Sequence, residues 1–482
     1  MSIKGLKKLI KAIFINVKGH PICKLPAVIT KPGRYFLNSD LVFHGSGTAI
    51  TIKSSNVFLD FDYHTLALTF AGSDVDHPNI GVLVDGPLIG DILSYSNIVL
   101  KNLSITTLVL SPNFSDAVQI NGAKHVTIES STLKNTSHGV LTQNVDGVHI
   151  TNTHFINNYG VRQFGNDINT RSFGANVFHG EDTKNLTIEK SVFTGQALGD
   201  LENVSFGTLG DELSQRVANI TIRDSQFVHS ESSIHPRQCD NLLIENCQFQ
   251  QTNTLYSVIQ FGNFLRSGTP NIRNVIIRNV NITALDSKNG ANIIALVAGD
   301  GALFQNVNVK SNSDSNSPAA ILIGSGEFAF NNVVFDNLIL TGPNFTGLNI
   351  FGSQNVTIKN SHLNEAFIQI LAQDAYNVTI KDSDIQGSIG IQFIITTDSV
   401  IENNVIRKNN LIGLFLAQGA NNNIVANNKL IRNGAAILDT GDNNELVGNI
   451  IIENESPCSP IEGLLRSNPS RSLDFRQQAK WK

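Results

Sequence analysis

The chain has 482 residues, of which 41% are hydrophobic and 16% are charged, with a formal net charge of −5 at pH 7. These values exclude a highly charged disordered polymer, and a sequence pI of about 6.2 argues against a dedicated nucleic-acid binder, which normally carries a basic domain. No uncharged apolar run reaches about 18 residues, so the sequence predicts no membrane-spanning helix.

Residues 1–26 are predicted to form an amphipathic helix that caps the fold behind it. The apolar stretch Ala12–Val17 is too short for the core of a secretory signal. The four cysteines fit neither a disulfide framework nor a zinc site, so they are expected to be reduced. Together these features favour a cytoplasmic protein or export by a non-classical route. The helix is predicted because apolar residues at helical spacing lie on the side opposite a row of lysines. The apolar residues are Leu6, Leu9, Ile10, Ile13, Phe14 and Val17, and the lysines are Lys4, Lys7, Lys8 and Lys11.

Asparagine is strongly over-represented, with 57 copies against 1 Met and 1 Trp. A bias of this size requires a structural role that repeats along the chain. Short segments that share one template supply the repeat: NLTIEKSVF (Asn185–Phe193), NITIRDSQF (Asn219–Phe227), NLLIENCQF (Asn241–Phe249), NVTIKNSHL (Asn355–Leu363) and NVTIKDSDI (Asn377–Ile385).

Aligning these segments on one apolar residue of the short strand gives an anchor column that is apolar throughout. It reads Leu100, Ile128, Ile150, Ile188, Ile222, Ile244, Ile277, Phe304, Phe335, Ile358, Ile380, Ile401, Val425 and Leu446. Five residues later a second apolar column reads Ile105, Leu133, Phe155, Phe193, Phe227, Phe249, Ile282, Val309, Leu340, Leu363, Ile385, Ile406, Leu430 and Ile451. Between the two lies a column of mostly small or amide-bearing residues that suits an internal bend.

The shortest anchor spacings are 21 to 24 residues, and the alternation of Val, Ile, Thr and Phe is typical of strands. A unit of that length cannot bury its own apolar side, so successive units must stack on one another and share a core. The pattern predicts an all-β fold, a right-handed parallel β-helix of about 14 coils over residues 27–454. Asn residues at equivalent bends are expected to adopt the left-handed conformation and to stack their amides along the rod. Cys247 falls in the bend column, where most other coils have small residues such as serine, so it is interpreted as a small buried residue that fills space in the core.

The opening segments Ile29–Leu37, Ala49–Ile52 and Asn56–Phe61, together with the repeats, resemble the pectin-lyase-like superfamily, specifically proteins with PbH1-type parallel β-helix repeats. The resemblance covers residues 27–454. Many bacterial members have a glycine before the pair equivalent to His64 and Thr65, where this chain has Tyr63. The resemblance implies the fold, and it leaves the activity open because one scaffold serves lyases, hydrolases, epimerases, tailspikes and adhesins.

Function is expected where the regular repeat is interrupted, because insertions in a solenoid become surface loops. The anchor spacing grows to 38 residues between Ile150 and Ile188 and to 34 between Ile188 and Ile222. The inserted stretches are residues 158–174 and 195–217. The strand that precedes each anchor adds outward pairs, namely His179 with Glu181 and, two coils later, His235 with Arg237.

These segments predict a side groove that suits an extended sugar chain. The candidate catalytic residues are Glu181, Asp182, Asp200, Asp211, His235 and Arg237. The candidate substrate-binding residues are Tyr159, Arg162, Arg171, His179 and Arg216. Glycoside hydrolysis would use two carboxyl groups about 5–5.5 or 6.5–9.5 Å apart. Uronate lyase chemistry would use Arg237 to neutralise a sugar carboxylate and a histidine as the base.

The function expected from the sequence is recognition of a polysaccharide or glycan, with cleavage by a lyase or a glycoside hydrolase left open. No cofactor is predicted, except that a lyase would be able to recruit Ca²⁺ through clustered carboxylates. An oligomer is compatible with the sequence. The alternative is a non-catalytic structural or adhesive β-helix, such as a surface or spike protein whose outward charges only form cross-strand ladders. Residues 455–482 are expected to cap the open end of the rod or to extend from it.

Overall fold

The computed structural model describes residues 19–69, 79–87, 93–108, 115–158, 175–195, 202–206, 217–229, 232–236, 238–251, 257–262, 272–284, 292–311, 319–325 and 328–454. These residues form strands, turns and bends and contain no helix. Of the predicted N-terminal helix over residues 1–26, the described part, residues 19–26, contains β1 (His20–Ile22) and no helix, and the remainder lies outside the described residues, as does the C-terminal extension. No helix in the described part of the chain is long and apolar enough to cross a membrane.

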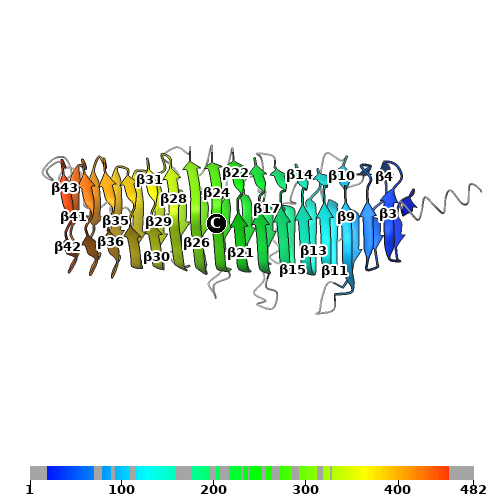
Figure 1. The fold of residues 1–482 in the computed structure, drawn as a ribbon, viewed down its shortest axis with the longest axis horizontal. Helices are drawn as coiled ribbons and strands as arrows, with labels where there is room; N and C mark the ends of the chain where they lie inside the picture. Colours follow the sequence, from blue (N-terminus) through cyan, green and yellow to red (C-terminus); the bar gives the residue numbers. More distant parts are fainter. Residues whose placement is uncertain are drawn as a thin grey trace, which may run out of the picture.

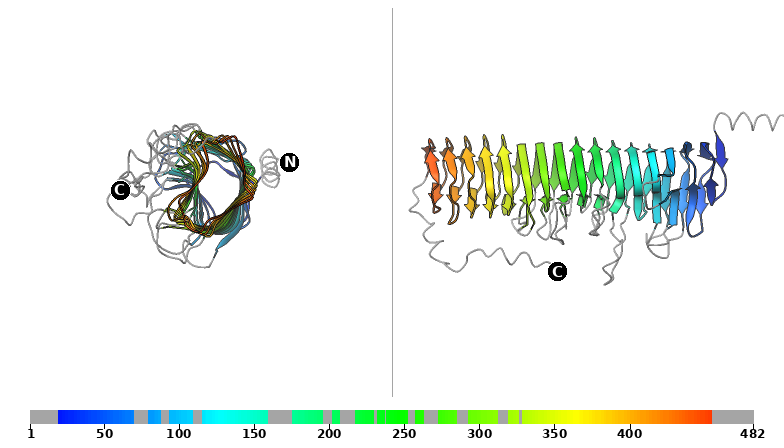
Figure 2. Two further views of the ribbon diagram at one scale, coloured as in Figure 1. Left: turned by 90° about the vertical axis from the view of Figure 1, so that its left-hand side faces the viewer. Right: turned by 90° about the horizontal axis from the view of Figure 1, so that it is seen from below.

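The described strands stack into a single long rod, with the chain advancing steadily from one end to the other (Figure 1). All strand pairs are parallel, and most strands pair with the equivalent strand one turn of chain earlier and one turn later. Viewed along the rod, the turns superpose around a common axis (Figure 2). Each turn, or coil, contributes to three sheets that run the length of the rod.

Sheet 1 contains sixteen strands: β2 (Ala27–Ile29), β5 (Thr48–Ile52), β8 (Asn79–Asp85), the first parts of β11 (Ser115–Glu129), β13 (His138–Thr151) and β15 (Ala175–Glu189), then β17 (Glu202–Phe206), β20 (Ser232–Pro236), β23 (Ile259–Phe261), β25 (Ile294–Leu296), β27 (Ile321–Ile323), β29 (Thr346–Phe351), β32 (Ile368–Gln373), β35 (Ile389–Ile394), β38 (Ile412–Leu416) and β41 (Ala435–Asp439).

Sheet 2 contains β1 (His20–Ile22), β3 (Gly33–Leu37), β6 (Val57–Asp60), β9 (Tyr95–Lys101), the second parts of β11, β13 and β15, then β18 (Ala218–Arg223), β21 (Cys239–Glu245), the first parts of β24 (Ile272–Ala284), β26 (Gly299–Ser311) and β28 (Phe330–Thr341), and finally β30 (Gln354–Lys359), β33 (Tyr376–Lys381), β36 (Val400–Glu402), β39 (Ile424–Ala426) and β42 (Glu445–Val447).

Sheet 3 contains β4 (Leu41–Phe43), β7 (Thr65–Leu68), β10 (Ser104–Thr107), β12 (Thr132–Lys134), β14 (His154–Ile156), β16 (Val192–Thr194), β19 (Gln226–Val228), β22 (Gln248–Gln251), the second parts of β24, β26 and β28, and then β31 (His362–Asn364), β34 (Asp384–Gln386), β37 (Val405–Arg407), β40 (Lys429–Ile431) and β43 (Ile450–Ile452).

The register confirms the anchor column along its whole length, since each predicted member pairs with the next. It confirms the second apolar column in the same way. The count of about 14 coils began at Leu100. His20, Tyr35 and Leu59 are successive register partners that precede Leu100 in the same column, so three further layers of sheet 2 lie before it.

Asparagine has the predicted role at the corners of the coils. Asn185, Asn219 and Asn241 all have positive φ angles of 55–62°, a left-handed conformation that Asn tolerates better than most residues. The side-chain amide of Asn219 donates to the side-chain oxygen of Asn185 one coil earlier at 2.9 Å, and that of Asn241 donates to Asn219 at 3.0 Å. Tyr63 also has a positive φ of 66°.

Near the C-terminal end the asparagine ladders move into the interior. The side-chain oxygen of buried Asn428 accepts the backbone N–H of Asn404 at 2.9 Å, and its amide donates to the carbonyl of Ile401 at 2.8 Å. In earlier coils, serine hydroxyls accept the corresponding backbone hydrogen bonds, as Ser225 Oγ does from the N–H of Ser191. Each corner therefore satisfies backbone groups that would otherwise be buried without a partner.

The outward charges of sheet 2 form the cross-strand ladder that the sequence predicted. Glu189 contacts Arg223 of the next coil, and Arg278 Nε lies 2.6 Å from Glu245 Oε1. Burial opposes the charged form of Glu189, but hydrogen bonds from Arg223 and His149 outweigh it, and the pKa of this carboxyl falls below its usual value. These pairs belong to the surface of the rod, and we assign them no further role.

Candidate functional site

Sheet 1 is the face of the rod that the long connections border. The connections from sheet 3 to sheet 1 include residues 157–174 and 195–201, and those from sheet 1 to sheet 2 include residues 207–217 and 262–271. The turns between sheets 2 and 3 are short in every described coil, as at residues 190–191 and 224–225. The insertions therefore emerge along both edges of one sheet, and its outward face is the candidate site.

The sequence predicted residues 195–217 to be one inserted loop, and the structure differs from that prediction. It contains β17, whose residues pair with β15 on one side and β20 on the other. The stretch thus contains the sheet 1 strand of its own coil, with a connection at each end. A five-residue strand without a strong apolar alternation gave little signal in the sequence.

The backbone register places His179 and His235 two coils apart in one row of sheet 1, as expected, with Ser205 between them. Glu181 pairs with Gln143 of the preceding coil, and Asp182 follows Glu181 on β15. The structure describes the backbone of His179, Glu181 and Asp182. The other candidates lie outside the described residues: Tyr159, Arg162, Arg171, Asp200, Asp211, Arg216 and Arg237.

His235 is partly exposed on β20, and its ring is held by the next coil. Its Nε2 lies 3.2 Å from the carbonyl oxygen of Gly262, so this nitrogen is the donor of that hydrogen bond. The Gln260 side chain donates to the same carbonyl at 3.4 Å. Gly262 has a φ of 84°, which a residue with a side chain adopts only with strain. His235 is therefore oriented by the corner that follows sheet 1.

Amide side chains continue this face toward the N-terminal end. Gln119 and Asn121 lie on β11 and pair with Leu141 and Gln143 of β13. The Gln119 amide donates to Asn121 Oδ1 at 3.3 Å, and the Gln119 carbonyl oxygen is buried and has no hydrogen-bond partner among the residues that the structure describes. An acceptor in this condition is satisfied when a ligand or a water supplies a donor.

Asp116 and His138 form a pair that the sequence did not reveal. His138 Nδ1 lies 2.7 Å from Asp116 Oδ1, and Asp116 is only 2% exposed. The two residues start adjacent strands of sheet 1 and are register partners. Their separation of 22 residues equals one coil, which is the signal that would have identified them once the register was known. A carboxylate that orients an imidazole is an arrangement suited to general-base chemistry.

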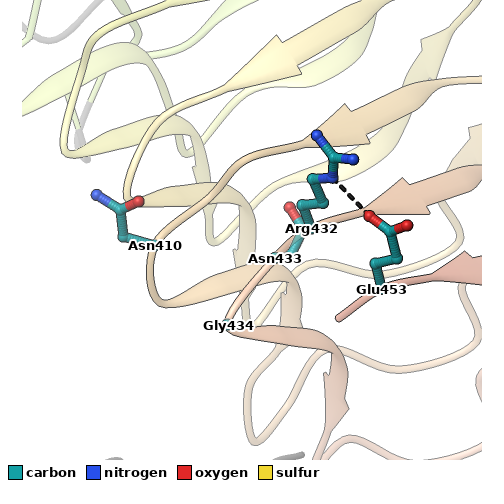
Figure 3. Close-up of a pocket in the computed structure, with 5 residues that line it drawn as sticks. All are labelled: Asn410, Arg432, Asn433, Gly434 and Glu453. Atoms are coloured by element: carbon teal, nitrogen blue, oxygen red, sulfur yellow. Dashed lines mark hydrogen bonds and ion pairs between the residues drawn. The ribbon is translucent and has the colours of Figure 1, made fainter. Parts of the chain in front are cut away.

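A shallow hollow of about 200 Å³ lies at the C-terminal end of the rod, lined by Asn410, Arg432, Asn433, Gly434 and Glu453 (Figure 3). Arg432 Nε lies 2.6 Å from Glu453 Oε2, so the charges of this hollow neutralise each other. Asn433 belongs to a buried ladder. The hollow is remote from the long connections, and we do not assign it a ligand.

The described residues contain no group of three or more His, Cys, Asp or Glu side chains placed to hold a metal ion. The possible recruitment of Ca²⁺ by carboxylates of the insertions is not tested by this finding, because those side chains lie outside the described part of the chain. The chemistry available on sheet 1 is hydrogen bonding by amides and imidazole, with one buried carboxylate–imidazole pair.

Comparisons with known proteins agree with this architecture. The family described as "Right handed beta helix region" matches residues 292–451. No curated protein sequence matches the chain. Among solved structures, the A-module of the mannuronan C-5 epimerase AlgE6 of Azotobacter vinelandii superposes with a TM-score of 0.50 at 12% identity, covering 84% of this chain and 91% of its own.

A tailspike protein mutant of E. coli bacteriophage HK620, solved in complex with a pentasaccharide, superposes with a TM-score of 0.51 at 13% identity. That match covers 77% of this chain and 69% of the tailspike chain. Identities this low support a common fold and nothing more specific. With three parallel sheets wound around one core, the described residues form a right-handed parallel β-helix, and the coils over residues 292–451 match the right-handed β-helix family.

Proposed function

We propose that this protein binds a polysaccharide or glycan along the outward face of sheet 1, over the coils from β11 to β23. The observation that carries the proposal is the group of amide and imidazole side chains on this face, between the two edges from which the long connections emerge. They lie in two neighbouring rows, with Gln119 and His235 in one and Asn121 and Gln143 in the other. The two structural neighbours described above are proteins whose names or bound ligands concern polysaccharides, which is consistent with this assignment.

Regular spacing along the rod suits an extended sugar chain. Parallel strands repeat at about 4.8 Å, so side chains in one outward row recur at that interval. Amides donate and accept hydrogen bonds at the same time, as sugar hydroxyls do. The buried and unpaired oxygen of Gln119 is an acceptor that a hydroxyl would satisfy.

Cleavage of the bound chain is the second candidate, and it is favoured by the pair of Asp116 and His138. In a uronate lyase, His138 oriented by Asp116 would remove the proton next to the sugar carboxylate, and Arg237 would neutralise that carboxylate. In a glycoside hydrolase, two acids among Glu181, Asp182, Asp200 and Asp211 would act instead. A structural or adhesive rod remains the alternative to both.

Binding is tested on an array of uronate-containing and neutral polysaccharides. The double substitution Gln119→Ala and Gln143→Ala is expected to remove the binding signal, and His235→Ala with Arg237→Ala is expected to weaken it. The matched control is Gln305→Ala, because Gln305 lies on the outward face of sheet 2. Equal binding by all variants with unchanged melting curves, or no binding by the wild type, would contradict the proposal.

Turnover is measured separately from binding, by following unsaturated products and new reducing ends. Asp116→Asn is expected to abolish lyase turnover with little loss of affinity, since the imidazole would lose its orienting carboxylate. Binding without any product would show that the protein binds the polysaccharides tested and does not cleave them.

A further inference from the structure

The two ends of the rod differ in how well they cover the core. At the N-terminal end, Ile22, Ile29 and Phe43 are all buried. At the C-terminal end, Leu446 is 47% exposed and Ile451 is 59% exposed, although every earlier residue from Leu100 onward in their two columns is buried. The last coil also exposes Val447, Ile450 and Ile452. The core therefore ends in an open apolar surface, which we name the open end and define as Leu446, Val447, Ile450, Ile451 and Ile452.

The hydrogen-bond ladders also stop at this end. The side-chain oxygens of Asn444, Asn449 and Asn454 accept the backbone N–H groups of the preceding coil, 21 residues earlier. The backbone N–H groups of these three asparagines have no partner of their own among the described residues. Within the described part of the chain, the outer edges of β41, β42 and β43 pair with no further strand. An edge of this kind pairs readily with another chain unless something covers it.

The regular repeat does not continue beyond Asn454. Another coil of 21 residues would require bend residues at positions 465, 470 and 475, which are Leu465, Ser470 and Phe475. Only the serine suits such a position. Residues 455–482 therefore differ from a further coil of the template, and they are apolar at several places: Ile461, Leu464, Leu465, Leu473, Phe475 and Trp481.

The last coil and the residues that follow it have opposite charges. Residues 435–454 contain four acidic residues and no Lys or Arg: Asp439, Asp442, Glu445 and Glu453. Residues 455–482 contain five basic and three acidic residues: Arg466, Arg471, Arg476, Lys480 and Lys482 against Glu455, Glu462 and Asp474. Charge complementarity of this kind favours association and fixes its orientation.

We propose that residues 455–482 fold back over the open end of their own chain and cap it. The segment starts at the last coil, so its docking would be intramolecular and its effective concentration high. Its 28 residues would reach at most about 90 Å when extended, far more than the width of one coil. The cap covers Leu446 and Ile451 with apolar side chains and places its basic residues beside the acidic last coil. It thereby blocks pairing of the exposed edges with a second copy.

The sole tryptophan of the chain, Trp481, reports directly on this contact. In the full-length protein its fluorescence is expected to be blue-shifted and protected from acrylamide. The double substitution Leu446→Asp and Ile451→Asp should shift the emission to that of water-exposed tryptophan and remove the protection. The matched control is Ile276→Asp with Ile339→Asp, which changes two partly exposed isoleucines in the middle of the rod. The control should leave the emission unchanged.

A second variant tests the contact without altering the rod. Arg471→Glu with Arg476→Glu reverses two charges of the tail and is expected to expose Trp481, with an unchanged circular dichroism spectrum.

Deletion of residues 455–482 should produce concentration-dependent association in sedimentation velocity, while the full-length protein stays monomeric. The proposal is overturned if Trp481 is exposed in the wild type, or if the open-end and control variants behave alike. It is also overturned if protection of Trp481 appears only as the full-length protein dimerises, which would identify a second copy as the occupant.

Discussion

The rings of Phe193 and Phe227 stack with centroids 4.6 Å apart and planes only 2° from parallel. Phe155 and Phe249 extend the stack on either side, with neighbouring centroids 4.8 and 4.7 Å apart. These separations match the spacing of parallel strands, so the register of sheet 3 dictates the distance between the rings. Four aromatic side chains thus form a continuous column inside the coils that carry the longest insertions.

Replacing Phe193 with alanine is expected to cost about 3–5 kcal/mol of unfolding free energy, because it leaves a cavity between two rings that cannot close without breaking the register. The measurement is the midpoint of denaturant unfolding, followed by circular dichroism. Tyr63→Ala is the control, since Tyr63 is 84% exposed and should change the midpoint very little. Equal midpoints for both variants would show that the phenylalanine column does not support the rod.

Asn428 gives a prediction about the interior ladder. Replacing it with leucine, which is similar in size, should destabilise the protein because the N–H of Asn404 and the carbonyl of Ile401 would lose their partner. Each buried group left unpaired costs about 1–3 kcal/mol. Asn428→Ser is the matched variant and should cost less, because a serine hydroxyl accepts the same kind of N–H at Ser383. A leucine variant as stable as the serine variant would refute the role of the amide.

The fold was predictable because each inward position is repeated in every coil. The anchor and second columns were identified from Ile128, Phe193 and similar residues, and the register reproduces both columns member by member. Asn and Ser at the corners were predictable for the same reason, since the same backbone conformation recurs at each of them. A periodic structure repeats its signal, and even weak residue preferences then add up.

The candidate site was less predictable because it depends on positions that do not repeat. The two-coil separation of His179 and His235 followed from the coil count, but the place of Ser205 between them and the pair of Asp116 and His138 required the exact register of the strands. The contact of His235 with the carbonyl of Gly262 depends on a corner conformation that the sequence does not specify. Side-chain contacts between non-repeating residues leave no periodic pattern to read.

Cysteine reactivity tests the placement of Cys247 inside the coil. Burial raises the pKa of this thiol to about 12, so the reactive thiolate is almost absent at pH 8. Burial also raises the pKa of Cys239, whereas Cys23 is exposed. Alkylation of the native protein with iodoacetamide is expected to modify Cys23 and to spare Cys239 and Cys247. Peptide mapping by mass spectrometry checks this, with the denatured protein as the control in which all three react. Rapid modification of Cys247 in the native protein would place it outside the core.

Asp384 predicts how stability depends on pH at the outer face of sheet 3. The Arg407 guanidinium donates to both carboxylate oxygens at 2.8 and 2.7 Å, and His362 lies 3.3 Å away. Hydrogen bonds from Arg407 hold the pKa of the carboxyl below its usual range. Because the folded state binds the proton less readily than the unfolded state, this pair stabilises the fold above the unfolded pKa of about 3.9. The contribution is lost as the pH falls through the lower, folded pKa.

Asp384→Asn should therefore lower the unfolding midpoint near neutral pH, and the difference from wild type should shrink as the pH falls below about 3.9. The loss near neutral pH should be small, about 0.2–1 kcal/mol, because both side chains are partly exposed. The control is the same substitution made in an Arg407→Gln background, where the carboxyl has lost its main cation and the pH-dependent difference should largely disappear. A difference that stays constant from neutral pH down to acid unfolding, or that persists in the Arg407→Gln background, would show that the ion pair does not contribute to stability.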